Sequence, residues 1–284
     1  MSKNPIYILL ASMTVLLSFA YKEYPKVKNY NDNQLHIYFF DVGEGDSALI
    51  KSPDNHLILI DGGPSREVLY KISEVMPFWI ETIDLVVISH SHADHITGVL
   101  SVFDRYNVKC ILYDESDESI SNTENQFRTR LEGGEYTVSD ELSKLGDSDC
   151  LPNAISIEEY SLRESAGKNE NYESISIFLK YAGFEALFLA DAEAPVQKII
   201  LDSISADIEV LKVPHHGSSD AFYSPLIKKL KPDLGIISVG ENNKFGHPNE
   251  EVVEGYSKYG IKILRTDLDG DIHVTSNGDL WKVL

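Results

Sequence analysis

Three histidines and one aspartate fall within six consecutive residues of this 284-residue chain. The run is HSHADH, and it directly follows the apolar run LVVI. Imidazole and carboxylate groups are ligands that zinc and its neighbours in the first transition row prefer. His90 and His92 can point the same way from one extended loop, and Asp94 and His95 can point toward a second position beside it. The spacing therefore predicts two metal ions a few ångströms apart, an arrangement that hydrolyses esters and phosphodiesters.

Further donor residues follow two other apolar runs. Asp191 ends the run ALFLA, and the run VLKVP leads into His215 and His216. A short apolar run that ends in a polar group is typical of a buried strand that delivers a ligand at its tip. Three strand ends that carry donor residues predict one site at one edge of a sheet.

These residues and several other motifs resemble the metallo-β-lactamase superfamily, and above all the lactamase-like domain of the DNA-uptake competence channel (ComEC-type) proteins. The matching motifs are HxHxDH, LADA around Asp191, PHHGS, DVGEGDS with Glu44 in place of Gln, LIDGG, ISVG, GHP and the closing RTD. The resemblance covers residues 35–280. It implies an α/β fold, the metallo-β-lactamase αββα sandwich, in which two mixed β-sheets lie face to face and helices cover the outside.

The resemblance also implies how a first metal is held. His90, His92 and a bridging Asp191 would bind it. The third histidine that the superfamily places at this site has no counterpart, because no histidine occurs between the HSHADH run and the PHHGS motif. The stretch 169–174 occupies that region instead. Open coordination positions suit catalysis, and they favour weaker binding, with Mn²⁺ as an alternative to Zn²⁺.

A second metal would be held by a different set of donors. The resemblance assigns it Asp94, His95, the shared Asp191 and one histidine of the PHHGS motif. We favour His216 as the ligand and His215 as a contact to substrate, with the reverse assignment left open. The expected cofactor is thus two divalent metal ions.

Catalytic roles follow from the chemistry of these groups. A metal-bound hydroxide is the expected nucleophile, and Asp94 can orient it and accept its proton. His215 and His247 can donate hydrogen bonds to a phosphate oxygen or stabilise an oxyanion. Asp61 either orients a ligand histidine or belongs to a plain turn. Asp46 either lines the site or belongs to a glycine-rich turn.

The composition limits the classes of function. The formal net charge is -20, from 45 acidic residues against 25 lysines and arginines. Such a surface repels polyanions at long range and lacks the basic footprint of a nucleic-acid-binding protein. This weighs against a simple nuclease, although a metal pair can invert the potential locally.

The N-terminus has the pattern of a targeting segment. Lys3 supplies a positive start, residues 6–19 are almost wholly apolar, and a small-x-small sequence ends at residue 20. This pattern predicts a signal peptide over residues 1–20, with an uncleaved N-terminal anchor as the alternative. The polar segment 21–33 is expected to be a linker, and residues 34–284 the metallo-β-lactamase-like domain.

A signal peptide places the domain outside the cytoplasm, in the periplasm or the extracellular space, and an uncleaved anchor would hold it at the membrane. Export would allow Cys110 and Cys150, the two cysteines of the chain, to pair. The alternative is two unrelated thiols.

Periodicity and turn residues predict the elements that position these groups. The expected strands are 35–40, 48–51, 56–60, 85–89, 108–113, 175–181, 186–190, 208–213, 234–239, 261–265, 272–275 and one near Trp281. The expected helices are 67–75, 96–106, 121–131, 194–203, 223–230 and 250–259. The polar insertion 114–160 either covers the site or is a solvated surface excursion.

Three functions are compatible with the sequence. The first is an exported dinuclear-metal-dependent hydrolase, a phosphodiesterase or nuclease, acting on single-stranded DNA or a small phosphoester. The second is a carboxyl-ester, lactone or β-lactam hydrolase on the same fold, against which the missing third histidine counts. The third is a non-catalytic metal-binding module, which the intact donor set argues against. No stable protein partner is inferred.

Overall fold

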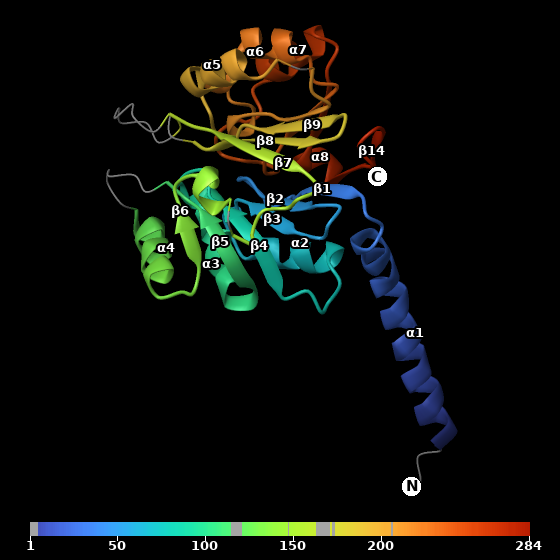
Figure 1. The fold of residues 1–284 in the computed structure, drawn as a ribbon. Helices are drawn as coiled ribbons and strands as arrows, with labels where there is room; N and C mark the ends of the chain where they lie inside the picture. Colours follow the sequence, from blue (N-terminus) through green and yellow to red (C-terminus); the bar gives the residue numbers. More distant parts are fainter. Residues whose placement is uncertain (1–4, 115–120, 147, 163–170, 172–173, 206) are drawn as a thin grey trace.

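The computed structural model describes residues 5–114, 121–146, 148–162, 171, 174–205 and 207–284. Within these ranges the chain forms two mixed β-sheets that pack face to face, with helices on both outer faces (Figure 1). The predicted αββα sandwich is confirmed.

The first sheet contains eight of the described strands. They are β1 (Leu35–Phe39), β2 (Ala48–Lys51), β3 (Leu57–Ile60), β4 (Thr82–Val87), β5 (Asn107–Leu112), β6 (Thr137–Ser139), β13 (Ile272–Ser276) and β14 (Trp281–Val283). Their order across the sheet is β14-β13-β1-β2-β3-β4-β5-β6. Pairing is antiparallel from β14 to β3 and parallel from β3 to β6. The carboxyl ends of β3, β4 and β5 therefore meet at one edge.

The second sheet contains six of the described strands. They are β7 (Ser156–Tyr160), β8 (Ser176–Tyr181), β9 (Phe184–Phe188), β10 (Val210–Lys212), β11 (Leu234–Ile237) and β12 (Lys262–Arg265). Their order is β12-β11-β10-β9-β8-β7, parallel from β12 to β9 and antiparallel beyond. The carboxyl ends of β9, β10 and β11 form the edge that delivers the second group of donors.

The core between the sheets follows from the two-residue period of the strands. On β1, Leu35, Ile37 and Phe39 belong to the cluster between the two sheets, whereas Tyr38 belongs to the cluster under the helices. The ring of Phe39 stacks on that of Phe188 from the second sheet, with centroids 5.5 Å apart. Full burial of such a side chain stabilises the fold by about 1.5–3 kcal/mol, so this alternation fixes which face of each sheet packs against the other.

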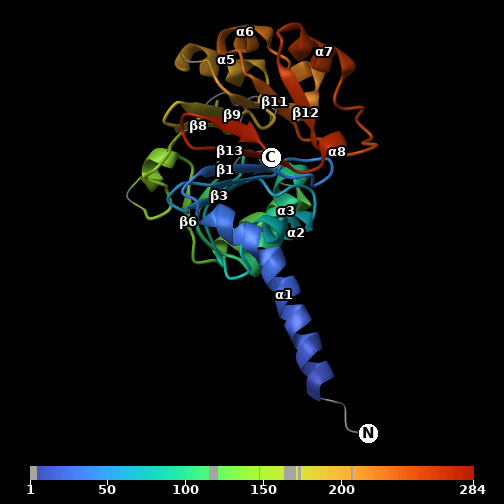
Figure 2. The same cartoon turned by 90° about the vertical axis from the view of Figure 1, so that its right-hand side faces the viewer.

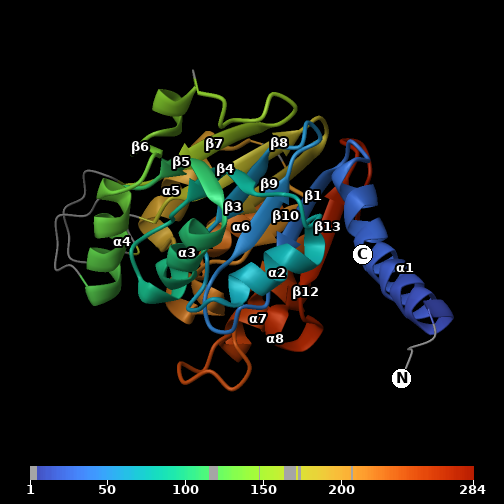
Figure 3. The same ribbon diagram turned by 90° about the horizontal axis from the view of Figure 1, so that it is seen from below.

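Helices cover the outer faces of both sheets. On the first sheet lie α2 (Glu67–Val75), α3 (Ala93–Arg105) and α4 (Asn122–Glu132), and on the second lie α5 (Ala194–Ser203), α6 (Ser224–Leu230) and α7 (Glu250–Lys258). Figure 3 shows α2 and α3 lying across the outer face of the first sheet. The six predicted helices are all present, and each begins and ends within a few residues of the predicted position. The short helix α8 (Thr266–Asp269) and the strands β6 and β7 were not predicted.

The N-terminal helix α1 (Pro5–Tyr30) extends farther than the sequence suggested. The segment 21–33, expected to be a linker, is helical as far as Tyr30 and continues through Pro25. Figures 1 and 2 show α1 projecting away from the sandwich. Among the described residues, no helix combines the length and the apolar character needed to cross a membrane. The signal peptide and the domain boundaries stay predictions.

Polar contacts hold the last turns of α1 on the domain. Lys26 Nζ lies 2.7 Å from a carboxylate oxygen of Glu23 and donates to the backbone oxygen of Ser73 at 2.8 Å. The other carboxylate oxygen of Glu23 accepts a hydrogen bond from the backbone N–H of Phe78 at 3.1 Å. The base of α1 is therefore part of the domain surface.

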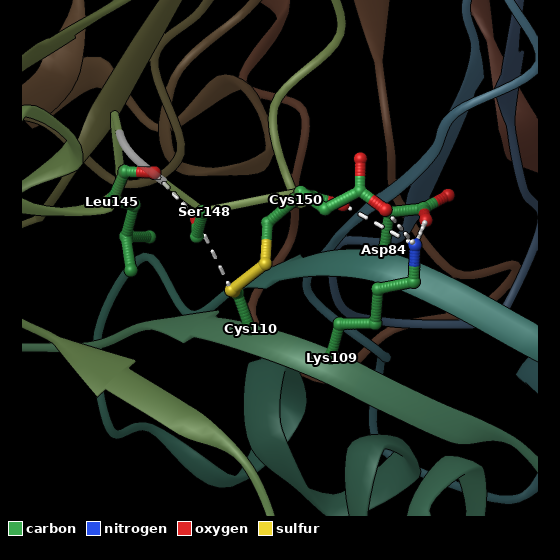
Figure 4. The surroundings of a disulfide bond; sticks show 7 residues. Asp84, Lys109, Cys110, Leu145, Ser148 and Cys150 are labelled. Atoms are coloured by element: carbon green, nitrogen blue, oxygen red, sulfur yellow. Dashed lines mark hydrogen bonds and ion pairs between the residues drawn. A yellow bond between two sulfur atoms is a disulfide. The ribbon is translucent and has the colours of Figure 1, made fainter.

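A disulfide ties the insertion 114–160 to the first sheet. Cys110 on β5 is bonded to Cys150, 40 residues later, with Cα atoms 5.9 Å apart (Figure 4). The structure therefore contains the predicted disulfide and not two unrelated thiols. The described part of the insertion adds β6 to the sheet and packs α4 on α3. A covering role for the insertion stays a prediction, because residues 115–120 lie outside the described residues.

Candidate metal centre

The donor residues lie at the carboxyl ends of strands from both sheets. The loop after β4 carries His90 and His92, and α3 begins at the next residue, so that Asp94 and His95 lie in its first turn. Asp191 follows β9 by three residues. Because the sheets pack face to face, these edges meet, which is where ligands bind in open α/β sheets.

One group of donors consists of His90, His95 and Asp191, all buried, with ligand atoms within 4.8 Å of one another. His90 Nε2 lies 3.7 Å from one oxygen of Asp191, and His95 Nε2 lies 3.6 Å from the other. His92 joins this group through its Nδ1, 2.8 Å from His90 Nε2. The structure thus brings His90 and Asp191 together as predicted for the first metal, with His95 as the third member of the group, whereas His92 contacts His90.

A second group consists of Asp94, His95 and His216, again with ligand atoms within 4.8 Å. His216 Nε2 lies 3.4 Å from Asp94 Oδ2 and 3.8 Å from Asp191 Oδ1. Asp191 therefore faces donors of both groups, as a bridging carboxylate must. His95 also belongs to both groups.

The two histidines of the PHHGS motif differ in their surroundings. The side chain of His216 is 3% exposed, and its Nδ1 donates to the backbone oxygen of Ser238 at 2.9 Å. This hydrogen bond leaves Nε2 facing Asp94 and Asp191. The side chain of His215 is 26% exposed, with Nε2 3.7 Å from Asp191 Oδ2. The geometry favours His216 as the ligand and leaves His215 accessible to substrate.

Unpartnered atoms test whether a metal fits these residues. His95 Nε2, His216 Nε2 and Asp191 Oδ1 are buried and have no hydrogen-bond partner in the described part of the chain. A buried polar atom without a partner costs about 1–3 kcal/mol. Three such atoms converge here, all of them of the kinds that bind zinc or manganese. The donor set therefore fits divalent cations.

Asp61, at the end of β3, fixes the orientation of His95. Its Oδ2 accepts hydrogen bonds from His95 Nδ1 at 2.9 Å and from the Ser89 hydroxyl at 2.7 Å, and its Oδ1 accepts the backbone N–H of Ser89 at 2.9 Å. Because Nδ1 of His95 is thus occupied, Nε2 is the nitrogen that faces the donors. Asp61 therefore orients a ligand histidine, as one of its two predicted roles required, and is not merely part of a turn.

Charged groups within the centre shift one another's pKa values. Burial lowers the pKa of His95, but the charges of Asp191 and Asp61 outweigh it and hold that pKa well above its usual value. Burial also lowers the pKa of His216, but Asp191 and Asp46 raise it to about 10. Burial raises the pKa of Asp191, but His95 and His216 hold it well below its usual value. A metal ion must therefore displace protons from the histidines.

A buried ion pair lies beneath the donors. Lys212 Nζ on β10 lies 2.6 Å from Asp46 Oδ2 and donates to the backbone oxygen of Val213 at 3.0 Å. Asp46 Oδ1 lies 3.4 Å from His216 Nδ1. The pair joins the two sheets directly under the centre. Sequence reasoning missed Lys212, and its one signal was a lysine within the apolar run VLKVP.

His247 lies at the rim of the centre. Its ring centroid is 5.8 Å from that of His215 and 6.4 Å from that of His216. His247 Nδ1 is buried without a hydrogen-bond partner among the described residues. Burial, then the neighbouring His216 and His215, lower the pKa of His247. A neutral imidazole therefore stands beside the donors, where the sequence predicted a substrate contact.

The backbone around the centre is left-handed at four non-glycine residues. Asp61, Ala190, His215 and His216 have φ of 56°, 48°, 49° and 51°. Such conformations are sparsely populated by non-glycine residues, and they concentrate at functional sites. Each of these residues lies in the centre or directly before a donor, so the strained backbone serves to aim the donors.

The stretch 169–174 that stands in place of a third histidine is described only at Asn171 and Ser174. The side chain of Asn171 donates to Glu193 at 3.2 Å. The next residue after the stretch, Ile175, donates its backbone N–H to the oxygen of Ser89 at 2.8 Å. The stretch therefore ends beside the loop that carries His90 and His92, and its other residues lie outside the described part of the chain.

Comparison with known proteins agrees with this architecture. The sequence profile of the Metallo-beta-lactamase superfamily matches residues 40–241. The chain is 28% identical over 256 residues to ComE operon protein 3 of Bacillus subtilis (strain 168), covering 82% of this chain and 32% of that protein. It is 24% identical over 246 residues to Competence protein ComA of Neisseria gonorrhoeae, covering 84% and 32%.

The chain therefore spans about a third of the length of these curated relatives. A crystal structure of the metallo-beta-lactamase fold protein YhfI from Bacillus subtilis superposes with a TM-score of 0.57 at 12% identity, covering 86% of this chain and 100% of that one. The fold, the paired His/Asp groups and the sequence match lead to one conclusion. The chain belongs to the metallo-beta-lactamase superfamily, and it resembles the ComEC-type competence proteins within it.

Proposed function

We propose that this protein is an exported dinuclear-metal-dependent hydrolase that cleaves phosphodiester bonds, in single-stranded DNA or in a small phosphoester. The observation that carries the proposal is the convergence of three buried, unpartnered ligand atoms, on His95, His216 and Asp191. The accessible His215 and His247 lie next to them. The competence proteins among the relatives support a nucleic-acid substrate, and the superfamily supports hydrolysis.

Two sets of residues would hold the metals. His90, His92 and Asp191 would bind one ion, and His216 would join Asp94, His95 and Asp191 around the other. When bound, two divalent ions, Zn²⁺ or Mn²⁺, supply Lewis-acid activation of water and of the phosphoryl oxygen. A mixed set of imidazole and carboxylate donors suits both metals.

The protein's own groups orient and stabilise the substrate. Burial raises the pKa of Asp94, but the neighbouring His216, 3.4 Å away, and the charge of His95 outweigh it, so Asp94 is ionised at neutral pH. An ionised Asp94 can orient the attacking water and accept its proton. The neutral His247 can donate one hydrogen bond to a phosphate oxygen, and His215 can donate a second.

A direct assay tests the proposal. The chain is loaded with zinc or manganese and tested on bis-p-nitrophenyl phosphate, nitrocefin and p-nitrophenyl acetate. The variant Asp191→Asn removes the shared carboxylate, and Asp207→Asn, an exposed aspartate on the surface, is the matched control. We expect phosphodiester cleavage that falls at least about 100-fold in Asp191→Asn and is unchanged in Asp207→Asn.

The other outcomes point to different functions. Ester or lactam cleavage without phosphodiester cleavage would mean a carboxyl-ester or β-lactam hydrolase. Stoichiometric metal without turnover of any of the three substrates would mean a metal-binding module. Either result would overturn the proposed activity.

We also propose that export precedes function, and the Cys110–Cys150 disulfide supports this because such bonds persist in oxidising compartments. Thiols are titrated in the full chain and in a chain that lacks residues 1–20, both expressed in the same bacterial host. We expect the disulfide in the full chain and free thiols in the truncated one. Free thiols in both would contradict export.

A further inference from the structure

An exposed aromatic ring stands beside the metal centre. Phe245, in the loop between β11 and α7, is 58% exposed. Its ring is nearly parallel to that of His247, with an interplanar angle of 14° and centroids 5.9 Å apart. His247 in turn lies against His215, whose Nε2 is 3.7 Å from Asp191. Phe245 is therefore the outermost ring of a row that begins at the metal donors.

Hydrogen bonds within the loop fix the backbone that carries this ring. Asn243 Oδ1 accepts the backbone N–H groups of Phe245 at 3.2 Å and His247 at 3.0 Å. Asn243 Nδ2 donates to the backbone oxygens of Gly240 at 3.1 Å and His247 at 2.7 Å. Gly246, between the two rings, has φ of 73°, a left-handed conformation that glycine adopts without strain. The two neighbouring rings are thus presented by a braced turn.

The loop is also tied to the opposite half of the molecule. The backbone N–H of Gly240 donates to Glu44 Oε2 at 2.8 Å, and Glu44 belongs to the turn between β1 and β2. The backbone that carries Phe245 is consequently fixed relative to both groups of donors. Apolar side chains exposed singly are common on proteins, but an aromatic ring that packs on His247 next to His215 is placed to contact a substrate.

A cation accompanies the ring. The exposed Lys244 places its Nζ 4.9 Å from the centroid of Phe245. On a protein of net charge -20, a lysine at this position offers an anionic substrate a local partner, and its flexible side chain can move from the ring to a phosphate. The ring and the ammonium together match the two parts of a nucleotide, the base and the phosphate.

We propose that Phe245 is a nucleobase-binding subsite, on which a base of the substrate stacks while the adjacent phosphate lies against His215 and His247. This inference rests on the proposed phosphodiesterase function and narrows its substrate to a nucleotide chain. Lys244 pairs with the next phosphate along that chain. Stacking of this kind contributes about 1–3 kcal/mol per base and tolerates every base, so we expect little sequence preference.

Binding of two oligonucleotides tests the subsite without depending on cleavage. The probes are a fluorescent phosphorothioate hexathymidylate, which resists hydrolysis, and its abasic counterpart, and the full chain is loaded with zinc. The variants are Phe245→Ala, the conservative Phe245→Tyr, and Tyr70→Ala as a control, because Tyr70 is an exposed aromatic residue on α2.

We expect Phe245→Ala to weaken binding of the thymidylate at least about fivefold and to leave binding of the abasic probe unchanged. Phe245→Tyr and Tyr70→Ala should bind both probes as the unaltered chain does. An equal loss for both probes, or no loss for either, would overturn the subsite. Base-dependent binding without cleavage of bis-p-nitrophenyl phosphate would instead overturn the hydrolytic function, so the two failures are distinguishable.

Discussion

The two sheets supply the metal centre in different ways. The first sheet provides neighbouring residues from His90 to His95, in the loop after β4 and the first turn of α3, and Asp61 at the end of β3 orients His95. The second sheet provides Asp191 and His216 from two separate strand ends, each beside a left-handed residue. One half is therefore built by local sequence, whereas the other exists only when three parallel strands have assembled and packed on the first sheet.

This difference makes the contacts between the halves critical. Asp46 and Glu44, in the turn after β1, reach across to Lys212 and Gly240 of the second sheet. These contacts lie directly beneath and beside the donors. Changes that loosen them should separate the two halves, and changes confined to one half should leave the other intact.

The largest effect is expected from Lys212→Met. It leaves Asp46 buried without its cation, which should lower the free energy of unfolding by about 3–5 kcal/mol. The double variant Asp46→Asn with Lys212→Met should recover part of that loss. Urea denaturation measures both, and Lys180→Met, which removes a partly exposed ion pair with Glu158, is the control at about 0–1 kcal/mol. Equal losses for the two lysines would show that the halves are held together by other contacts.

The Cys110–Cys150 disulfide should stabilise the first sheet and its insertion without affecting the metal centre. Its loop of 40 residues corresponds to about 4 kcal/mol of stabilisation in the chain-entropy model. Denaturation with and without reductant should show this difference, and the double variant Cys110→Ser with Cys150→Ser should be insensitive to reductant. Bound metal should be unchanged, because neither cysteine contributes to the donor groups. Loss of metal on reduction would show that the insertion supports the centre.

Asp61→Asn should weaken the bracing without removing a donor. The amide cannot accept from both His95 and Ser89 as the carboxylate does, so metal affinity should fall about 10–100-fold. Competition with a chelator measures the affinity. Asp54→Asn, in the turn between β2 and β3 at the opposite end of β3 from Asp61, is the matched control. An affinity equal to that of the control would mean that packing alone orients His95.

The smallest effect at neutral pH is expected from a histidine pair away from the centre. His36 Nδ1 and His273 Nε2 are 2.8 Å apart between β1 and β13. Burial, then the charge of His36, lower the pKa of His273 from 6.5 to about 3. Below pH 6.5 the unfolded chain binds a proton that the folded chain does not, so stability is lost as the pH falls from 6.5 toward 3.

The expected slope is up to about 1.4 kcal/mol per pH unit for this group. Denaturation at a series of pH values measures it, in a chelator so that metal does not contribute. His273→Gln should flatten the slope, and His56→Gln, in the turn between β2 and β3, is the control. An unchanged slope in His273→Gln would assign the acid sensitivity to the histidines of the centre instead.

The same comparison explains what the sequence could predict. The donors from His90 to His95 were recognisable because they fall within six residues, Asp191 because it directly follows an apolar run, and His216 because it belongs to a histidine pair that does. Lys212 was not, because its partner Asp46 lies 166 residues away and only the packed sheets bring them together. Strand β7 was missed because its sequence, SIEEY, has two glutamates among five residues and forms an edge strand that is not fully buried.

The N-terminal segment shows a second limit. Residues 21–33 are polar and contain Pro25, which favours a linker by composition. The helix persists because Glu23 and Lys26 bond to the backbone of the domain, contacts that no local pattern reveals. No local sequence pattern indicates a role for Phe245 either, because its position beside His247 and His215 depends on how the chain folds.

Anomalous diffraction from crystals grown with zinc is the most direct test of the account. We predict two peaks, one among His90, His92 and Asp191 and one among Asp94, His95 and His216, with the carboxylate of Asp191 between them. A single peak, or peaks that Asp191 does not contact, would contradict a dinuclear centre shared by the two halves.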